Sequence, residues 1–431
     1  MELKKRVLET VEARSRDVVG FVQNLVRAPS VNRPPDGDEA KCQELVAEKF
    51  KELGLQIDRF RPDQVEGIRD HPAFLTGRNY ANRENVVGVL RGEGGGRSLI
   101  LTGHMDVVPL GPWAWTVPPW GGELRDGKIY GRGVLDMKAG VGAMIMALQS
   151  VLETGAKLKG DIILESVVDE EFGGVNGTLS CILRGYRADA VVSPEPTALS
   201  VSPGCLGGLL FRITTRGGSG IPVGRARAAT QSNSVIAGMA VIEALFKYED
   251  QRQARVPRHP LWRSFPCPIP SPLMISAVEA GVVGGIITTP EKCVIEAWFT
   301  SLPSQYKTRD EWENELKAFL AKASEKDVRM KGAQVEIESV GRWHPGYAGD
   351  RDHPIVKVVR RNLEEASEKP VKVLGFPAPG DLWAVALYGN MPALYAGPAG
   401  DGAHASDEYV TIESLMAVTK AYALTILDWC T

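Results

Sequence analysis

The sequence predicts an α/β fold, in which a mostly parallel sheet flanked by helices is interrupted by an inserted ferredoxin-like α+β domain. A chain of 431 residues exceeds the size at which one hydrophobic core usually stops growing. Helical and strand-like apolar segments alternate through the first half of the chain. In the middle the order changes to strand, helix, two strands, helix and strand, which is the order of a ferredoxin-like unit.

The first segments alternate between helix and strand. Apolar residues at helical spacing predict helices over residues 3–25 and 38–53. Apolar strands are expected over residues 55–60, 85–90 and 98–101. The glycine-rich stretch 91–96 is interpreted as a hairpin connection between two of these strands, and not as a phosphate loop, because no helix follows it.

The remaining segments complete two domains. A buried helix is expected over 139–152, strands over 161–168, 188–193 and 391–397, and a closing helix over 412–429. The inserted unit has expected strands at 209–215, 273–279, 293–299 and 334–340, and helices at 234–248 and 311–323. We therefore expect residues 1–206 and 344–431 to form the main domain and residues 207–343 to form the insertion.

Composition excludes several classes of protein. The 50 Lys and Arg residues balance 53 Asp and Glu residues, with no basic block, so no nucleic-acid partner is expected. Six scattered cysteines without a C-x-x-C pair indicate reduced thiols and a cytoplasmic location. The first 30 residues mix charges among apolar positions, so we expect neither a signal peptide nor a membrane anchor.

Histidines and acids follow the expected strands. In chain order, the candidates are His104, Asp106, Asp136, Glu170, Glu171, Glu195 and His404. Several have an ordinary interpretation when taken singly: a loop histidine and a turn acid for His104 and Asp106, an N-cap for Asp136, and a solvated acidic loop over residues 169–171. Glu195 fits a solvated position less well, because it lies between two prolines directly after a buried strand. Because the carboxyl ends of parallel strands share one edge, which is where such folds bind ligands, we expect these side chains to lie together.

This donor set suits divalent metal ions. Imidazole and carboxylate ligands match zinc, manganese or cobalt, and the absence of cysteine ligands argues against a closed structural zinc site. If one carboxylate bridges, the ligands suffice for two ions about 3.5–4 Å apart that share a water of lowered pKa. A remaining carboxylate can then accept the proton.

Five motifs include the candidate residues: Gly103-His104-Met105-Asp106, Gly131-Arg132-Gly133 with Asp136-Met137-Lys138, Asp169-Glu170-Glu171, Ser193-Pro194-Glu195-Pro196-Thr197 and His404-x-x-Asp407-Glu408. These motifs resemble those of the acetylornithine deacetylase and succinyl-diaminopimelate desuccinylase family of dinuclear zinc amidohydrolases, related to aminoacylases and carboxypeptidases. They occur in the family's order over nearly the whole chain, so the resemblance is specific.

The resemblance implies a role for each candidate. His104 and Glu195 would bind one metal, Glu171 and His404 the other, and Asp136 would bridge them. Glu170 would be the general base that activates the shared water and protonates the leaving nitrogen. Asp106 would orient the His104 ring. The inserted domain would be a lid that dimerises, which implies a homodimer or a higher homo-oligomer.

The chain departs from the family in its inserted domain. The family carries a histidine after the first lid strand that polarises the scissile carbonyl, whereas this chain reads Gly217-Gly218-Ser219-Gly220-Ile221-Pro222. Loss of one oxyanion donor costs about 10²–10³ in rate in a comparable site. His259 and His344 are the other histidines of this region, and we assign neither a catalytic role.

Tryptophans stand where relatives carry carboxylate-binding arginines. Trp298 and Trp383 occupy the two positions, either as parts of the substrate pocket or as core residues. If they line the pocket, an aromatic substrate is favoured over an acylated amino acid. Trp113, Trp115 and Trp120 are candidates for further walls of that pocket.

The leading hypothesis is a metal-dependent hydrolase that cleaves the C–N bond of a small N-acyl or N-formyl amine, with an aromatic amine favoured. One alternative is a metal-dependent deaminase of an activated aromatic amine, which accommodates the missing histidine. Another is a protein that binds metal or ligand without catalysis. We expect two divalent ions, zinc first, with manganese, cobalt and single occupancy left open. The sequence leaves the substrate and the oligomeric state undetermined.

Overall fold

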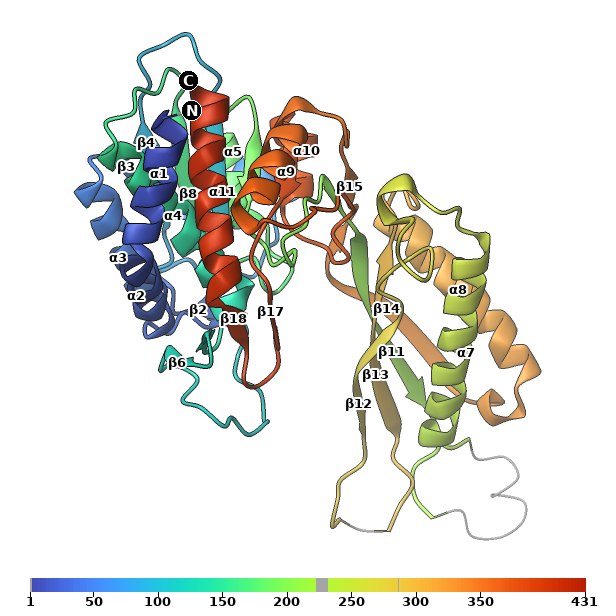
Figure 1. The fold of residues 1–431 in the computed structure, drawn as a ribbon. Coiled ribbons are helices and arrows are strands. Elements are labelled where there is room, and N and C mark those ends of the chain that lie inside the picture. Colours follow the sequence, from blue (N-terminus) through green and yellow to red (C-terminus); the bar gives the residue numbers. More distant parts are fainter. Residues whose placement is uncertain (1, 222–231, 286) are drawn as a thin grey trace. The chain divides into compact units, whose positions relative to one another are not determined.

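The computed structural model describes residues 2–221, 232–285 and 287–431 (Figure 1). The chain divides into two compact units. The larger unit comprises residues 1–204, 348–376 and 380–431, and the smaller unit comprises residues 205–347 and 377–379. Each unit has its own apolar core.

A six-stranded sheet forms the centre of the larger unit. Its strands, in spatial order, are β16 (Ala393–Tyr395), β9 (Val191–Ser193), β5 (Leu99–His104), β8 (Ile162–Val167), β4 (Asn85–Leu90) and β3 (Gln56–Phe60). The first four run parallel, and β4 and β3 are each antiparallel to their neighbours. This sheet confirms the predicted α/β class, with the parallel strands adjacent to one another.

Helices cover both faces of this sheet. The helices of the larger unit are α1 (Glu2–Ala13), α2 (Ser15–Val26), α3 (Ala40–Glu52), α4 (Ala139–Glu153), α5 (Asn176–Leu183), α9 (Pro354–Ser367), α10 (Leu382–Gly389) and α11 (Ile412–Cys430). Leu99 and Leu101 of β5 join the apolar cluster that contains α4 and α11, while Ile100 between them is buried outside that cluster. Helix α5 packs against β8 and α10. Both faces of the sheet are therefore buried, as parallel sheets require.

The predicted helix over residues 3–25 is two helices. The break falls at Arg14, whose φ of −91° and ψ of 9° depart from helical geometry. Helices α1 and α11, from the two ends of the chain, pack side by side (Figure 1). The helical segment Val134–Glu153 is long and apolar enough to cross a membrane, but 89% of its most apolar 18 residues are buried inside the protein, as in a core helix.

The hairpin predicted around residues 91–96 is wrong. Strand β8 lies between β4 and β5, so these two strands are not neighbours. The glycine-rich loop instead crosses the segment before β8, where Glu93 N donates to Leu158 O. A Cβ on Gly92 would lie 2.3 Å from the carbonyl oxygen of Lys159. The glycines therefore permit a close backbone crossing, which is a different use of the same residue type.

Smaller sheets complete the larger unit. One has the order β17 (Gly400–Asp401), β18 (Tyr409–Thr411), β7 (Lys128–Tyr130) and β6 (Glu123–Arg125). A two-stranded sheet of the larger unit pairs β1 (Asn32–Arg33) with β2 (Asp36–Gly37). A second pairs β10 (Gly204–Cys205) with β15 (Tyr347–Ala348), at the residues where the chain passes from one unit to the other. The sheet of β17 and β18 holds the loop that carries His404.

The smaller unit is a ferredoxin-like sheet with two helices. Its antiparallel strands have the order β12 (Met274–Ala280), β13 (Lys292–Ser301), β11 (Gly207–Arg216) and β14 (Gln334–His344). Helices α7 (Ser234–Arg255) and α8 (Arg309–Lys326) supply the other half of its core. The predicted order of elements and the ferredoxin-like topology are both present.

Candidate metal centre and active site

The candidate residues gather at the carboxyl edge of the parallel strands. His104 is the last residue of β5. Glu170 and Glu171 follow β8, and Glu195 follows β9. Since β8, β5 and β9 are adjacent and parallel, their ends bring these residues to one edge.

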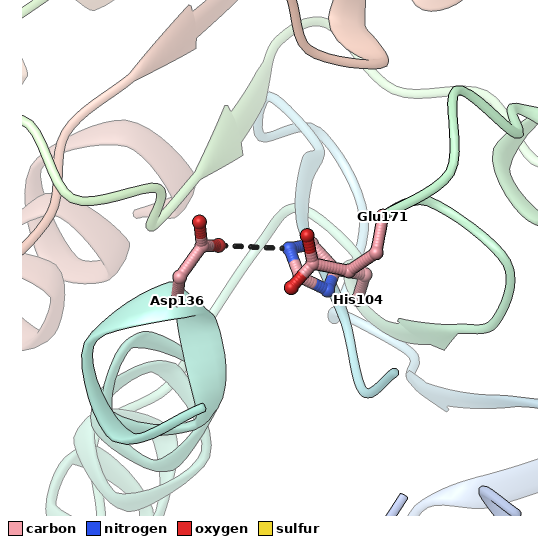
Figure 2. Close-up of side chains that lie close together, drawn as sticks. All are labelled: His104, Asp136 and Glu171. Atoms are coloured by element: carbon pink, nitrogen blue, oxygen red, sulfur yellow. Dashed lines mark hydrogen bonds and ion pairs between the residues drawn. The ribbon is translucent and has the colours of Figure 1, made fainter. Parts of the chain in front are cut away.

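Three side chains form the centre of the cluster. The nearest ligand atoms of His104, Asp136 and Glu171 all lie within 4.8 Å of one another. His104 Nε2 lies 3.1 Å from Asp136 Oδ1. Figure 2 shows the Asp136 carboxylate at the start of a helix and the Glu171 carboxylate on a loop, both beside the His104 ring. Three separate segments therefore converge on one point.

Two more side chains, His404 and Glu195, lie against this centre. His404 Nε2 lies 2.9 Å from Glu171 Oε2 and 3.4 Å from Asp136 Oδ2. Glu195 Oε1 lies 3.5 Å from His104 Nε2. Asp136 thus directs one carboxylate oxygen to each imidazole. This is the arrangement that a carboxylate shared by two ions needs.

Glu170 lies beside the cluster without joining its closest contacts. Its Oε2 atom is 4.0 Å from His104 Nε2, and its side chain is 17% exposed. The other carboxylates of the cluster, at Asp136, Glu171 and Glu195, each lie closer to an imidazole. A carboxylate placed in this way remains free to exchange a proton.

Asp106 holds the site together differently from expectation. His104 Nδ1 lies 2.9 Å from the backbone oxygen of Asp106 and 3.7 Å from its carboxylate. The carboxylate instead accepts hydrogen bonds from the backbone N–H groups of Glu170 and Glu171 and from Asn32 Nδ2. The backbone of Asp106 therefore orients the imidazole, with Nδ1–H donating and Nε2 left for a ligand. Its side chain orients the acidic loop.

Asp136 owes its position to the backbone before α4. Gly133 adopts a φ of 76°, and a Cβ there would lie 2.1 Å from Val107 Cγ1. Asp136 and Met137 interrupt the helical geometry, and the peptide bond between them is cis. The alternative of an N-cap does not hold, because the residue preceding α4 is Lys138, with no side-chain cap. The Asp136 carboxylate is directed to the imidazoles instead.

Crowding of carboxylates and imidazoles shifts their pKa values. The pKa of Glu195 rises to about 8 through burial and the nearby Asp136 charge. The pKa of Glu171 also rises, through burial and Asp136. The pKa of His404 rises to about 11, chiefly because of the Glu171 charge. Burial lowers the pKa of His104, but its hydrogen bonds to Asp136 and Glu195 outweigh this and raise it.

These shifts test whether the residues fit metal ions. Buried carboxylates at this separation repel one another unless positive charge lies between them. Divalent cations supply that charge, and imidazole and carboxylate are ligands that they accept. The donor set and its spacing therefore fit divalent metal ions, bound by side chains from β5, the turn before α4, and three loops.

The tryptophans divide into two groups. Trp383 is buried at 2% exposure in α10, its ring 5.9 Å from that of Tyr388, so it fills core. Trp115 and Trp120 lie over the cations of Arg132 and Lys138. Trp113, by contrast, is 59% exposed. Of these four tryptophans Trp113 is the most exposed, Trp115 and Trp120 are partly exposed, and Trp383 is buried.

The inserted-domain positions are explained within the smaller unit. Trp298 lies edge-on to His344, with ring centroids 6.3 Å apart. His344 is buried at 3% exposure, and His259 Nδ1 accepts a hydrogen bond from Leu261 N. Gly217–Ile221 carry no histidine, and Pro222 lies outside the described residues. His344 is thus a buried side chain at the end of β14, and His259 caps the short helical turn Pro260–Trp262.

Several supporting residues were not predicted from sequence. Asp169 accepts hydrogen bonds from Tyr80 and Asn32 directly before the acidic loop. Asp381 is buried and accepts a hydrogen bond from Thr178. Asp169 belongs to a recognised motif, but partners far away in sequence give it its role, and no spacing indicates them.

A sheet edge with two imidazoles and several carboxylates around a shared point defines the site of a metal-dependent hydrolase. The model of peptidase family M20/M25/M40 matches residues 100–428, and the chain belongs to this family. The predicted resemblance and the predicted class of amide hydrolase are thereby confirmed.

The chain is similar to two curated enzymes and to a solved structure of this family. N-formyl-4-amino-5-aminomethyl-2-methylpyrimidine deformylase of Halalkalibacterium halodurans is 27% identical over 440 residues, covering 99% of this chain and 97% of that protein. Succinyl-diaminopimelate desuccinylase of Leptothrix cholodnii is 32% identical over 212 residues, covering 47% and 51%. A dinuclear metal binding peptidase of Bacillus subtilis shares the fold, with a TM-score of 0.61, 14% identity and coverage of 97% and 99%.

Proposed function

We propose that this protein removes the formyl group from an N-formyl aminopyrimidine or a similar heteroaromatic amine. The observation that carries this proposal is the position of Glu170 beside a cluster of imidazoles and carboxylates, without membership in its closest contacts. The similarity to a deformylase over nearly the full length of both chains supports the substrate class. The products are formate and the free amine.

The charge of the site supports a substrate without a carboxylate. Among the described residues, no lysine or arginine forms an ion pair with Asp136, Glu170, Glu171 or Glu195. Two divalent ions would balance these four carboxylates and leave no surplus positive charge for an anionic substrate. A neutral or cationic amine fits better than an acylated amino acid, whose carboxylate needs a cationic partner.

The roles follow from these positions. His104 and Glu195 would hold one ion, Glu171 and His404 the other, and Asp136 both. When bound, such ions lower the pKa of a water molecule and polarise a carbonyl oxygen. Glu170 would accept a proton from the attacking water as its oxygen bonds to the formyl carbon, and would then deliver that proton to the nitrogen as the amide C–N bond breaks, which leaves formate and the free amine. Zinc is the proposed metal, since its ligand preferences include both donor types.

Substrate profiling of the metal-reconstituted protein tests this proposal. N-formyl, N-acetyl and N-succinyl amines and the free aminopyrimidine would be compared, with formate and ammonia measured separately. Formate release from the N-formyl compound is expected. Ammonia release from the free amine without formate would establish deamination instead, and two bound ions without any turnover would establish a binding protein.

A Glu170→Gln variant tests the base. It is expected to keep its metal content and to lose activity by about 10²–10⁴, the usual contribution of a general acid–base group. Glu66→Gln, at an exposed position in the larger unit, is the matched control. A Glu170→Gln protein with bound metal and full activity would refute this role.

We also propose that the smaller unit is a lid that forms a homodimer through its edge strand β12. This strand lies at the end of its sheet, and Met274 and Val278 on it are more than half exposed. Ile236, Met239 and Phe246 of α7 add exposed apolar surface. Unpaired strand edges readily add a partner strand. Light scattering of a Val278→Lys variant should report monomers, and an unchanged dimer would contradict the proposal.

We propose a cytoplasmic location because the cysteines of this chain are free thiols. All six are free in the structure, and five of them are buried. Cysteine thiols stay reduced in a reducing compartment such as the cytoplasm. Mass spectrometry of the unfolded protein, isolated under alkylating conditions, should therefore find all six cysteines alkylated, and fewer would argue for disulfides.

A further inference from the structure

Glu408 is a buried carboxylate outside the proposed ligand set. It lies four residues after His404, directly before β18, and is 1% exposed. Its Oε1 atom accepts hydrogen bonds from the backbone N–H groups of Leu135 and Asp136, at 2.9 and 3.1 Å. Its Oε2 atom accepts from Gly133 N at 2.8 Å and from the Arg132 guanidinium at 2.7 Å.

These contacts determine the path of the turn that carries Asp136. A buried carboxylate is costly unless its oxygens are hydrogen-bonded, and here both oxygens have two donors. Three of the four donors are backbone N–H groups within a single turn, and one of them belongs to Asp136 itself. The carboxylate therefore restrains the backbone from which the Asp136 side chain projects.

The same residue also restrains the loop that carries His404. The backbone oxygen of Glu408 accepts a hydrogen bond from Gly131 N. His404 and Asp407 have positive φ values of 63° and 55°, which are uncommon for residues other than glycine. Asp407 is tied in turn to Thr116 through two hydrogen bonds. Such a loop keeps its conformation only if its surroundings hold it.

We propose that Glu408 is a positioning residue that keeps Asp136 and His404 in register. It thereby sets the affinity of the metal position that these two residues share with Glu171. The separation of 3.4 Å between His404 Nε2 and Asp136 Oδ2 joins the two segments that Glu408 connects. The other position shares Asp136 but takes its remaining ligands, His104 and Glu195, from the ends of β5 and β9. The side-chain hydrogen bonds described for Glu408 go to residues 132–136 and include neither of these two ligands, so that position loses the support of one ligand where the first loses the support of two.

Removal of Glu408 should therefore weaken one metal position more than the other. Groups behind metal ligands typically change metal affinity by about 10- to 100-fold. A Glu408→Gln variant keeps the shape of the side chain, but its amide N–H₂ group replaces one carboxylate oxygen and faces the two N–H groups that donated to that oxygen. We expect about 10- to 100-fold weaker binding at one position and binding within a few-fold of wild type at the other.

The experiment is a titration of the metal-free full chain with Zn²⁺, followed by metal analysis, and with Co²⁺, followed by visible absorption. Glu413→Gln is the matched control, because Glu413 lies nearby at the start of α11 with a 74% exposed side chain. Glu408→Asp, which keeps the charge, is the second variant and should bind between wild type and Glu408→Gln. It also provides the measurement if Glu408→Gln does not fold.

The outcomes separate positioning from simple stabilisation. Selective loss of one ion in the Glu408 variants supports the proposal. A lowered Tm with wild-type affinity at both positions, or an equal loss at both, overturns it. The inference rests on the metal ligands of the proposed function but not on its substrate. A wild-type protein that binds two ions and releases no formate would refute the deformylase and leave this test intact.

Discussion

Replacing Asp106 by asparagine is expected to lower kcat by up to about 100-fold while the fold and metal content remain. The Asp106 carboxylate is fully buried and accepts hydrogen bonds from Glu170 N at 3.0 Å, Glu171 N at 3.0 Å and Asn32 Nδ2 at 2.8 Å. The asparagine side chain has the same shape but no charge. The change therefore acts on the strength of these three bonds and leaves the packing intact.

The magnitude follows from those three bonds. A hydrogen bond to a charged group contributes about 1.5–3 kcal/mol, against about 0.5–1.5 kcal/mol for a neutral one. The loss is thus about 1 kcal/mol for each bond and about 3 kcal/mol in total. If all of it appears as misplacement of the Glu170 loop in the transition state, the rate falls by about 100-fold. This figure is an upper bound, because part of the loss will appear in the stability of the folded chain.

The assay compares kcat, KM and zinc content of Asp106→Asn with those of wild type, using the N-formyl substrate. Asp352→Asn, at an exposed position in the larger unit, is the control for the chemical change itself. A variant that keeps full zinc content and a kcat within about threefold of wild type would refute the reasoning, because the three bonds would then not position Glu170.

Three further predictions concern stability. Gly103→Ala places a Cβ 2.9 Å from Val141 Cγ2 and 3.0 Å from Met137 Cε. We therefore expect the free energy of unfolding, measured in urea, to fall by about 1–3 kcal/mol. An unchanged urea midpoint would contradict this expectation. The pKa of His344 is lowered to about 3 by burial, with Arg342 adding to the effect. Since the unfolded histidine binds its proton near pH 6.5, the free energy of unfolding should fall by up to about 1.4 kcal/mol per unit as the pH drops from about 6 towards 3. His344→Gln should show a shallower decline than wild type, and equal slopes would exclude this origin. Chelation of divalent ions should lower the Tm, because the crowded carboxylates lose their counter-charges, and zinc should restore it; a Tm independent of metal would argue against the proposed centre.

Much of the site could be predicted because its signal is local. An apolar strand that ends in a histidine or an acid indicates both a buried strand and a side chain at its exit, and β5 with His104 follows this pattern. Parallel strands then bring such exits to one edge without further information. The order of elements in the smaller unit was equally readable, since each element there is long and regular.

Other features depend on contacts between distant segments. The glycine-rich stretch before β5 carries the same composition whether it turns a hairpin or crosses another segment, and the insertion of β8 between β4 and β5 decides which. Trp383 could line a pocket or fill core, and its burial in α10 assigns it to the core. Composition cannot distinguish a hairpin from a crossing, or a pocket residue from a core residue, because both members of each pair satisfy the same local preferences.

The sequence by itself determined the class of chemistry, because residue type sets which donors a metal can have and strand ends set where they emerge. Only the tertiary structure decided how the donors are held. Asp106 orients His104 through its backbone and uses its carboxylate for the acidic loop. Glu408 reaches the turn of Asp136 across more than 270 residues. A hydrogen bond depends on distance in space, and no spacing along the chain encodes such a distance for residues that far apart.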